Sequence, residues 1–188
     1  MIIAGVDEVG RGPLAGPVVA CAIILFEDTT IYGIKDSKKL TPKAREELFP
    51  EILRAAIDWK IGCISNCLID EINIREATFE AMRQAVLKLS PKPEHVFVDG
   101  FNIPGITIPQ TCFIRGDETI QSIQAASIVA KVLRDRLMEF YDIMYPQYKF
   151  CQHKGYATRE HIEIIKKIGP SQIHRKSFSP IKDIKKNR

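Results

Sequence analysis

Acidic residues follow several apolar runs in this sequence, and together they could carry chemistry. Asp7 and Glu8 follow the run IIAGV, Asp99 follows HVFV, and Asp117 follows TCFIRG. In open α/β sheets, ligand sites gather outside the carboxyl ends of the strands. If these runs are neighbouring strands, the acids converge from distant parts of the chain. The alternative for any one of them is a turn or a helix cap, the commoner use of an aspartate after a strand.

The adjacency of Asp7 and Glu8 raises a geometric question. Strand alternation points neighbouring side chains to opposite faces of a sheet. Glu8 can therefore join Asp7 only if the strand ends or bulges there, which the freedom of Gly10 permits. Asp117 has its own alternative, which is to cap the helix expected after it.

Clustered carboxylates indicate a metal site. They repel one another and raise one another's pKa unless a divalent cation offsets their charge. Mg²⁺ and Mn²⁺ prefer oxygen ligands, and no His or Cys lies close to these acids in sequence, which argues against Zn²⁺. Two such ions, roughly 3.5–4 Å apart, are a known arrangement for in-line phosphoryl transfer. The pattern therefore favours phosphoryl-transfer chemistry assisted by Mg²⁺ or Mn²⁺.

Basic residues accompany the acids. In the run Gly10, Arg11, Gly12, the glycines let a backbone approach a ligand closely, and Arg11 can bind a phosphate through two donors. A tight turn into the following proline explains the same residues. Lys38 lies in a polar loop, residues 36–39, that either touches a phosphate or is simply solvated.

The C-terminal part combines basic and aromatic residues. Tyr156 either stacks on a sugar or base, or is half buried in the core. Arg175 and Lys176 lie in a segment, 165–188, with eight basic residues and one acidic residue, whereas residues 1–164 hold 19 basic and 22 acidic residues. This asymmetry favours an anionic partner, with nucleic acid first, or else a solubilising tail.

The bulk composition is that of an ordinary globular protein. The 188 residues are 45% hydrophobic and 27% charged, enough for one sizeable core. The five cysteines form no C-x-x-C pair, which favours a reducing, cytoplasmic setting. The longest apolar run, 17–26, is about half a membrane span, so no membrane association is expected. We expect a single domain over 1–188, in which 165–188 form a basic segment that contacts the substrate.

The elements that must position these residues mix strands with helices. The runs 2–6 and 17–26 are typical of strands and lie close enough in sequence to be antiparallel neighbours, and 31–34 is a possible third strand. Further strands are expected at 59–65, 95–99 and 111–115, and helices from Thr41, over 73–89, over 120–144 and from about Thr158. This order predicts an α/β fold with a mixed sheet and helices on its faces.

Seven stretches, in one order and across nearly the whole chain, resemble the ribonuclease HII family, the type 2 ribonucleases H. They are GVDEVGRGPLAGPVV (5–19), DSKKL (36–40), VDG (98–100), RGD (115–117), QAASIVAKVLRD (124–135), HKGYAT (153–158) and GPSQIHRKSF (169–178). The resemblance implies a ribonuclease H-like mixed β-sheet flanked by helices, with a helical C-terminal extension. It also implies an endonuclease that cleaves the RNA strand of RNA–DNA hybrids. Such an enzyme would further cut 5′ of single ribonucleotides in duplex DNA, leaving 3′-OH and 5′-phosphate ends.

The resemblance assigns roles residue by residue. Asp7, Glu8, Asp99 and Asp117 fall on the family's metal-binding catalytic acids, which implies two Mg²⁺ or Mn²⁺ ions in the substrate complex, although another acid could be the fourth ligand. The loop Gly10–Gly12 falls on the family's G-R-G loop, which recognises the ribose 2′-OH. Further substrate contacts are implied at Lys38, Tyr156, Arg175 and Lys176.

The implied partners are nucleic acids. They are RNA–DNA hybrids and ribonucleotide-containing duplex DNA, bound by a monomer whose C-terminus is a possible contact for a DNA clamp. Two rivals remain open: a nuclease of the same fold that acts on DNA junctions or single strands, and a binding module whose acids are structural. Cleavage that requires a divalent ion would exclude the binding module, and cleavage that requires a ribonucleotide would exclude the nuclease acting on other DNA.

Overall fold

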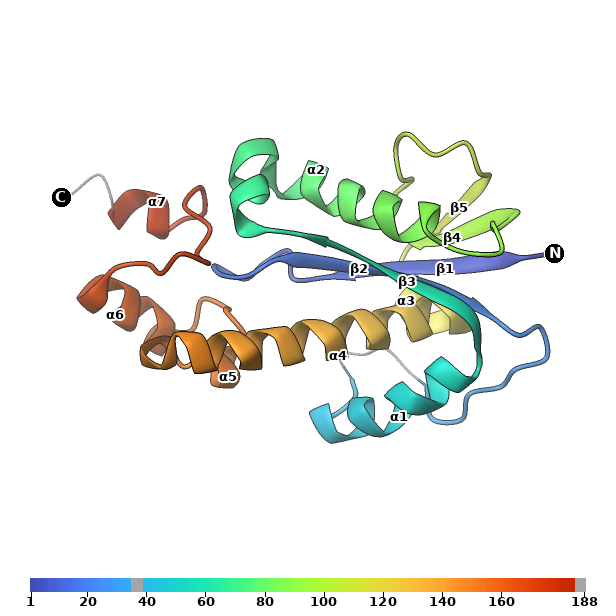
Figure 1. The fold of residues 1–188 in the computed structure, drawn as a ribbon, viewed down its shortest axis with the longest axis horizontal. Helices are drawn as coiled ribbons and strands as arrows, with labels where there is room; N and C mark the ends of the chain where they lie inside the picture. The colour runs from blue at the N-terminus through green and yellow to red at the C-terminus, as the bar shows by residue number, and fades with distance from the viewer. Residues whose placement is uncertain (35–38, 185–188) are drawn as a thin grey trace.

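A five-stranded mixed sheet forms the centre of the protein, in the order β3-β2-β1-β4-β5 (Figure 1). The computed structural model describes residues 1–34 and 39–184. The strands are β1 (Ile3–Val9), β2 (Val18–Leu25), β3 (Ala56–Ile64), β4 (His95–Asp99) and β5 (Gln110–Phe113). β2 pairs antiparallel with β1 and β3, whereas β4 pairs parallel with β1 and β5. The predicted mixed sheet and the antiparallel pairing of the first two strands are confirmed.

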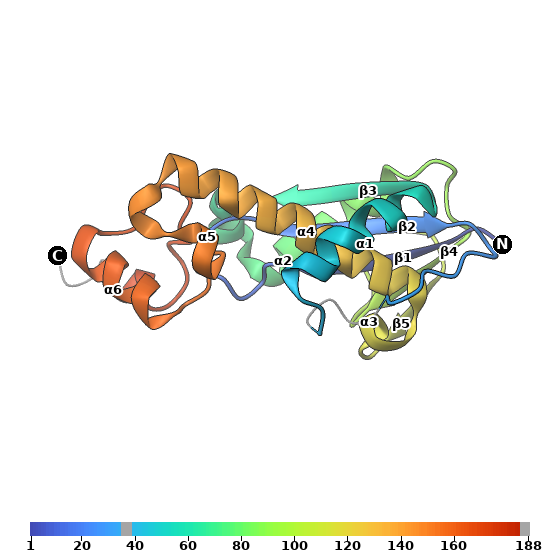
Figure 2. The same cartoon turned by 90° about the horizontal axis from the view of Figure 1, so that it is seen from below.

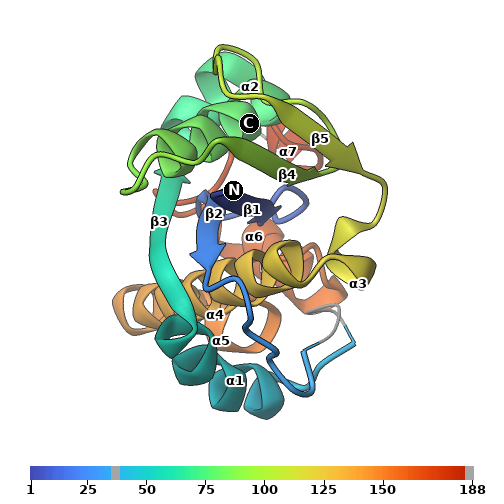
Figure 3. The ribbon, with the colours of Figure 1, turned by 90° about the vertical axis from the view of Figure 1, so that its right-hand side faces the viewer.

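Helices cover both faces of the sheet. They are α1 (Pro42–Arg54), α2 (Asn66–Leu87), α3 (Gly116–Thr119), α4 (Gln121–Met144), α5 (Phe150–His153), α6 (Arg159–Ile168) and α7 (Ile181–Ile184), with a 3₁₀ turn η1 at Pro146–Tyr148. The end-on view shows α2 on one face, and α4 with α1 on the other (Figure 3). The predicted helical C-terminal extension, α5 to α7, lies beyond the end of the sheet away from the N-terminus (Figure 2). None of the helices in the described ranges has the length and apolar character to cross a membrane.

The strand β1 sets the two sides of the core by alternation. Ala4 and Val6 pack in the apolar layer under α2. Gly5 faces α4, and a Cβ at Gly5 would collide with the backbone of Ser122. Because Gly5 has no side chain, α4 lies directly on β1, and the next residue on that face, Asp7, is buried beneath the helix.

Local sequence explains the helix starts. Thr41 caps α1 by accepting a hydrogen bond from the Ala44 amide at 3.1 Å, as predicted. α2 joins two helical segments across a kink at Asn73: Ser65 caps the first, and the second begins after Asn73, as predicted. Asn73, with φ 67°, interrupts α2, and its side chain accepts from the amides of the two residues that restart the helix, at 2.9 and 3.2 Å.

The possible strand at 31–34 is wrong. This stretch is a turn, in which Ile31 is buried against α4 and its amide donates to Gln121 Oε1 at 3.0 Å. Gly33, with φ +77°, turns the chain back. Burial of one isoleucine therefore anchors a loop here, and its apolar character does not reflect a strand pairing.

An apolar cluster around Phe150 and Tyr148 holds the C-terminal extension together, and the rings of three buried histidines contact Phe150. The rings of His153 and His161 stack with centroids 4.0 Å apart, and Nε2 of His161 lies 3.0 Å from Nε2 of His174. Nδ1 of His161 bonds the Tyr156 carbonyl at 2.8 Å. This cluster therefore fixes the backbone at Tyr156, which is expected to contact the substrate.

Candidate active site

Three aspartates converge where β1, β4 and α3 meet. Side-chain oxygens of Asp7, Asp99 and Asp117 lie within 4.8 Å of one another. Val6 pairs with Val98 in the parallel register, which sets Asp7 beside Asp99. The Gly116 amide donates to Asp99 Oδ1 at 2.7 Å, and so it holds the start of α3 against the end of β4. The site therefore depends on strand order and on one short turn.

The cluster is buried and electrostatically strained. Asp7 is only 4% exposed and Asp117 only 3%. Burial raises the pKa of Asp7 well above its usual value, and the charges of Glu8 and Asp99 raise it further, against a hydrogen bond from Ser127 that lowers it. A set of hard oxygen donors at this spacing fits Mg²⁺ or Mn²⁺, whose charge would offset that repulsion.

Glu8 occupies a different position from the three aspartates. β1 pairs regularly with β2 from Ala4 to Val9, so the strand neither ends nor bulges at Glu8. The Glu8 side chain lies on the α2 face and is not one of the three described acids whose oxygens cluster. Burial raises the pKa of Glu8, opposed by Arg11, whose Nη1 lies 3.4 Å from Oε1. The charge of Asp99 also raises this pKa, which places Glu8 at the border of the cluster.

A cavity of about 470 Å³ opens beside Glu8 and Asp99. Its walls come from the end of β1, the second half of α2 and the loop after β4. The lining residues are Glu8, Arg11, Arg75, Thr78, Phe79, Met82, Asp99, Gly100, Phe101, Asn102 and Pro104. A volume of this size is in the range of ligand sites, about 300–1,000 Å³.

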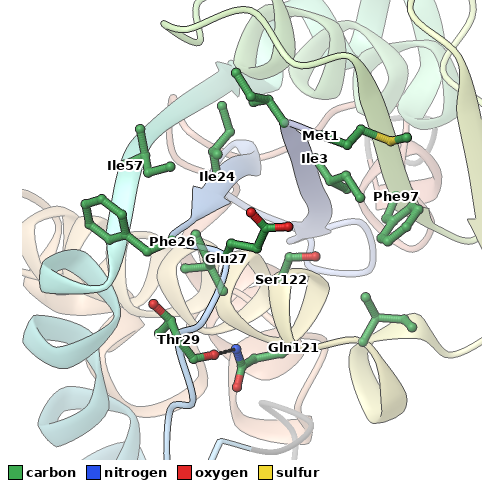
Figure 4. A pocket seen from close by; sticks show the side chains of 13 residues that line it. Met1, Ile3, Ile24, Phe26, Glu27, Thr29, Ile57, Phe97, Gln121 and Ser122 are labelled. Carbon is green, nitrogen blue, oxygen red and sulfur yellow. Dashed lines mark hydrogen bonds between the residues drawn. The ribbon is translucent and has the colours of Figure 1, made fainter.

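A second cavity, of about 440 Å³, lies at the other end of β1. Figure 4 shows Glu27 among Met1, Ile3, Ile24 and Ile57, with Gln121 donating to the Thr29 carbonyl at 2.7 Å. The three clustered aspartates do not line this cavity. The chemistry is therefore at the carboxyl end of β1.

The loop after β1 is held from behind by Arg175. Its Nε, Nη1 and Nη2 donate to the carbonyls of Gly16, Arg11 and Gly10 at 3.0, 2.9 and 2.5 Å. Arg175 is fully buried, so it does not reach the surface where a substrate would lie. The expectation that Arg175 contacts the substrate backbone is corrected: its guanidinium binds the loop's own carbonyls. Burial and the charge of Arg134 lower the pKa of Arg175.

Arg134, from α4, holds the same loop and was missed by sequence reasoning. Its donors bond the carbonyls of Pro17, Ala15 and Lys154 at 3.0, 3.1 and 3.1 Å, and it is fully buried. The available signal was its position on the buried face of α4, four residues before Met138, where a charge requires partners. Gly10, with φ +93°, leaves room for this side chain.

The remaining predicted contacts have separate positions. Tyr156 is 42% exposed, and a Cβ at Gly12 would lie 3.7 Å from its ring, so the tyrosine flanks the loop. Lys176 is exposed, and its amide donates to Asp70 at 2.8 Å. Lys38 lies outside the described residues. The structure therefore brings together the acids, the glycine loop and Tyr156, with Lys176 on the surface.

Known proteins share this fold and sequence. The profile of the family described as Ribonuclease HII matches residues 4–181. A ribonuclease HII of Caldicellulosiruptor saccharolyticus is 53% identical over 94% of this chain and 86% of its own. The ribonuclease H2 crystal structure from Pyrococcus horikoshii superimposes with a TM-score of 0.85 at 28% identity, over 100% of this chain and 98% of that one. The ribonuclease HII of Archaeoglobus fulgidus, solved as a complex with PCNA, gives 0.80 at 27% identity over 93% and 94%.

The fold and the acidic site define an endoribonuclease of the ribonuclease H class. Within that class, the family match over residues 4–181 and the 53% identical relative settle the membership. The chain belongs to the ribonuclease HII family, whose members cleave the RNA strand of RNA–DNA hybrids.

Proposed function

We propose that this ribonuclease cuts on the 5′ side of a single ribonucleotide within duplex DNA, as well as within RNA–DNA hybrids, and leaves 3′-OH and 5′-phosphate ends. One observation carries the proposal. Asp7 and Glu8 immediately precede the loop Gly10–Gly12 in sequence, Asp99 and Arg11 line the same cavity, and Tyr156 flanks that loop. Cleavage and sugar recognition would therefore act on neighbouring parts of one nucleotide.

The acids supply the metal-binding part of this mechanism. Asp7, Asp99 and Asp117 would hold two Mg²⁺ or Mn²⁺ ions at the scissile phosphate, with Glu8 contributing from the border of the cluster. Bound divalent ions would lower the pKa of an attacking water and offset charge on the phosphate oxygens. Burial of Asp7 keeps bulk water away from the acids, which strengthens charge interactions there.

The glycine loop supplies the recognition of the sugar. In a trans peptide the C=O and N–H point in opposite directions. Because the carbonyls of Gly10 and Arg11 point inward to Arg175, the amides of Arg11 and Gly12 point outward. Two outward donors beside Tyr156 can bond the 2′-OH and its neighbouring phosphate. A site built to bond a hydroxyl rejects the analogue lacking it by about 10⁴ or more.

The variant Asp7→Asn tests the metal role. We expect it to abolish cleavage of an RNA–DNA hybrid while hybrid binding is kept, because a neutral amide removes repulsion without removing the binding surface. Asp28→Asn, an exposed acid in the turn after β2, is the matched control and should cleave normally. Near-normal cleavage by Asp7→Asn would exclude the metal role of the cluster. Metal-independent binding without cleavage by the unaltered protein would favour the binding module.

The wider setting is part of the same proposal. The enzyme would act as a monomer in the cytoplasm, its basic segment 165–188 would contact the substrate, and its C-terminus would be the contact for a DNA clamp. The complex of the Archaeoglobus relative with PCNA supports the clamp contact. Sedimentation and a pull-down with the clamp, using the full chain, measure both.

A further inference from the structure

We propose that the 470 Å³ cavity beside Glu8 and Asp99 is a subsite for the sugar and phosphate of the nucleotide just 5′ of the scissile phosphate. This inference rests on the proposed function, because it takes the acids as the position of the scissile phosphate. It assigns a role to Arg75, Phe79 and Phe101, which the cleavage chemistry itself does not use.

The cavity is continuous with the site. Glu8, Arg11 and Asp99 line it, and each also belongs to the acids or to the glycine loop. Its far walls are Arg75 and Phe79 on α2 and Phe101 in the loop after β4. A nucleic-acid strand whose scissile phosphate is bound at the acids would therefore pass next to this cavity.

The chemistry of the walls suits a sugar and a phosphate. Phe101 is 73% exposed, and Phe79 and Pro104 add further apolar surface, against which the carbon face of a sugar ring can pack. The Arg75 guanidinium lies 5.6 Å from the centroid of the Phe79 ring. It forms no ion pair with any side chain in residues 1–34 and 39–184, so its charge is available for an anion. A base in a duplex stays paired, so the backbone is the part that enters.

The other arginine of this region serves as a contrast. Arg83 pairs with Glu80 and donates to the Pro104 carbonyl at 3.2 Å. It therefore fixes the loop that forms the cavity wall, while Arg75 is exposed and lines the cavity. The same helix thus carries one structural arginine and one exposed arginine, eight residues apart.

The position of Tyr156 sets the direction of the strand. Tyr156 and the outward amides of the glycine loop take the ribonucleotide, which lies 3′ of the cut in the proposed reaction. Tyr156 does not line the cavity, which the glycine loop borders through Arg11 alone, and its other walls are Glu8, Asp99, α2 and the loop after β4. The cavity is therefore available for the nucleotide on the 5′ side of the cut.

A charge-deletion experiment tests the phosphate contact. Binding of a duplex with one ribonucleotide is measured with single neutral methylphosphonates placed in turn along both strands. We expect the unaltered enzyme to lose about tenfold in affinity when the phosphate one step 5′ of the scissile phosphate is neutral. The affinity of Arg75→Ala should be the same whether that phosphate is charged or neutral. Arg75→Ala should also reduce the log–log salt slope of binding by about 0.9. Arg54→Ala, an exposed arginine at the end of α1, should leave both unchanged.

The outcomes are distinguishable. The subsite would be overturned if Arg75→Ala removed the effect of a methylphosphonate only at a phosphate 3′ of the cut or on the uncut strand. It would also be overturned if Arg75→Ala removed that effect at no phosphate. If the unaltered enzyme still cuts 5′ of the ribonucleotide, the proposed function stands without it. A second variant, Phe101→Ala, should raise KM severalfold with kcat kept, beside the exposed Phe140→Ala as a control. An unchanged KM in Phe101→Ala would remove the packing role.

Discussion

The hydrogen bonds of Arg175 make a quantitative prediction. Arg175→Lys keeps a positive charge, but one ammonium replaces a fork that bonds three carbonyls from 2.5 to 3.0 Å. If lysine keeps one bond, two are lost. A hydrogen bond to a charged group contributes about 1.5–3 kcal/mol, so the free energy of unfolding should fall by about 3 kcal/mol or more. For a chain of this size, 1 kcal/mol shifts Tm by about 2–4 °C, so we expect a fall of about 6–12 °C.

Stability alone would not show that Arg175 positions the loop. We therefore expect kcat/KM for a one-ribonucleotide duplex, measured well below the lower Tm, to fall at least about tenfold, because the outward amides lose their fixed direction. Mn²⁺ binding by the aspartates should be unchanged. Arg136→Lys is the control. Arg175 lies over the Phe178 ring at 5.0 Å and Arg136 over the Phe49 ring at 4.7 Å, but the Arg136 side chain is 49% exposed and pairs with Glu46. An Arg175→Lys variant that melts and cleaves like Arg136→Lys would exclude the positioning role of Arg175.

Three further predictions concern other parts of the fold. Burial lowers the pKa of His161 to about 4 and of His174 to about 3. In the unfolded chain the histidine pKa is near 6.5, so below that pH the unfolded state binds more protons than the folded state. The free energy of unfolding therefore decreases as the pH falls from about 6.5 towards 4. Each ring should contribute a loss on the order of 2 kcal/mol at pH 5 relative to pH 8, measured by denaturant unfolding. Gly5→Ala should destabilise by about 1–3 kcal/mol, since its Cβ meets the Ser122 backbone, and calorimetry reads this directly. Lys176→Ala should lower the salt slope of hybrid binding by about 0.9, and an unchanged slope would mean that this lysine touches no phosphate.

Much of the framework could be predicted from local sequence. Apolar runs ending in acids located Asp7 and Asp99 at the carboxyl ends of parallel neighbours, and Thr41 and Thr158 marked two helix starts. These signals work because each depends on residues close together in the chain. The gathering of Asp7, Asp99 and Asp117 depends on the strand order, which the sequence did not predict beyond a mixed sheet.

The rest depended on contacts between distant segments. The sequence marked Arg175 as a basic residue in a basic tail, but a bridge between Ala15 and His174 draws it beneath the loop, where its guanidinium donates to three carbonyls. Whether Glu8 faces the cluster depended on whether β1 continued, and pairing to β2 carries the strand through to Val9. The spacing of nearby residues predicts neither the burial of Arg175 beneath the loop nor the continuation of β1 past Glu8.

The most direct test of the account uses a labelled DNA duplex with one ribonucleotide, beside an otherwise identical all-DNA duplex, each with Mg²⁺, Mn²⁺ or chelator. The account predicts one cut, 5′ of the ribonucleotide, only when metal is present and only in the first duplex. Equal cutting of the all-DNA duplex would contradict the reading of the 2′-OH by the glycine loop. Cutting in chelator would contradict the metal role of Asp7, Asp99 and Asp117.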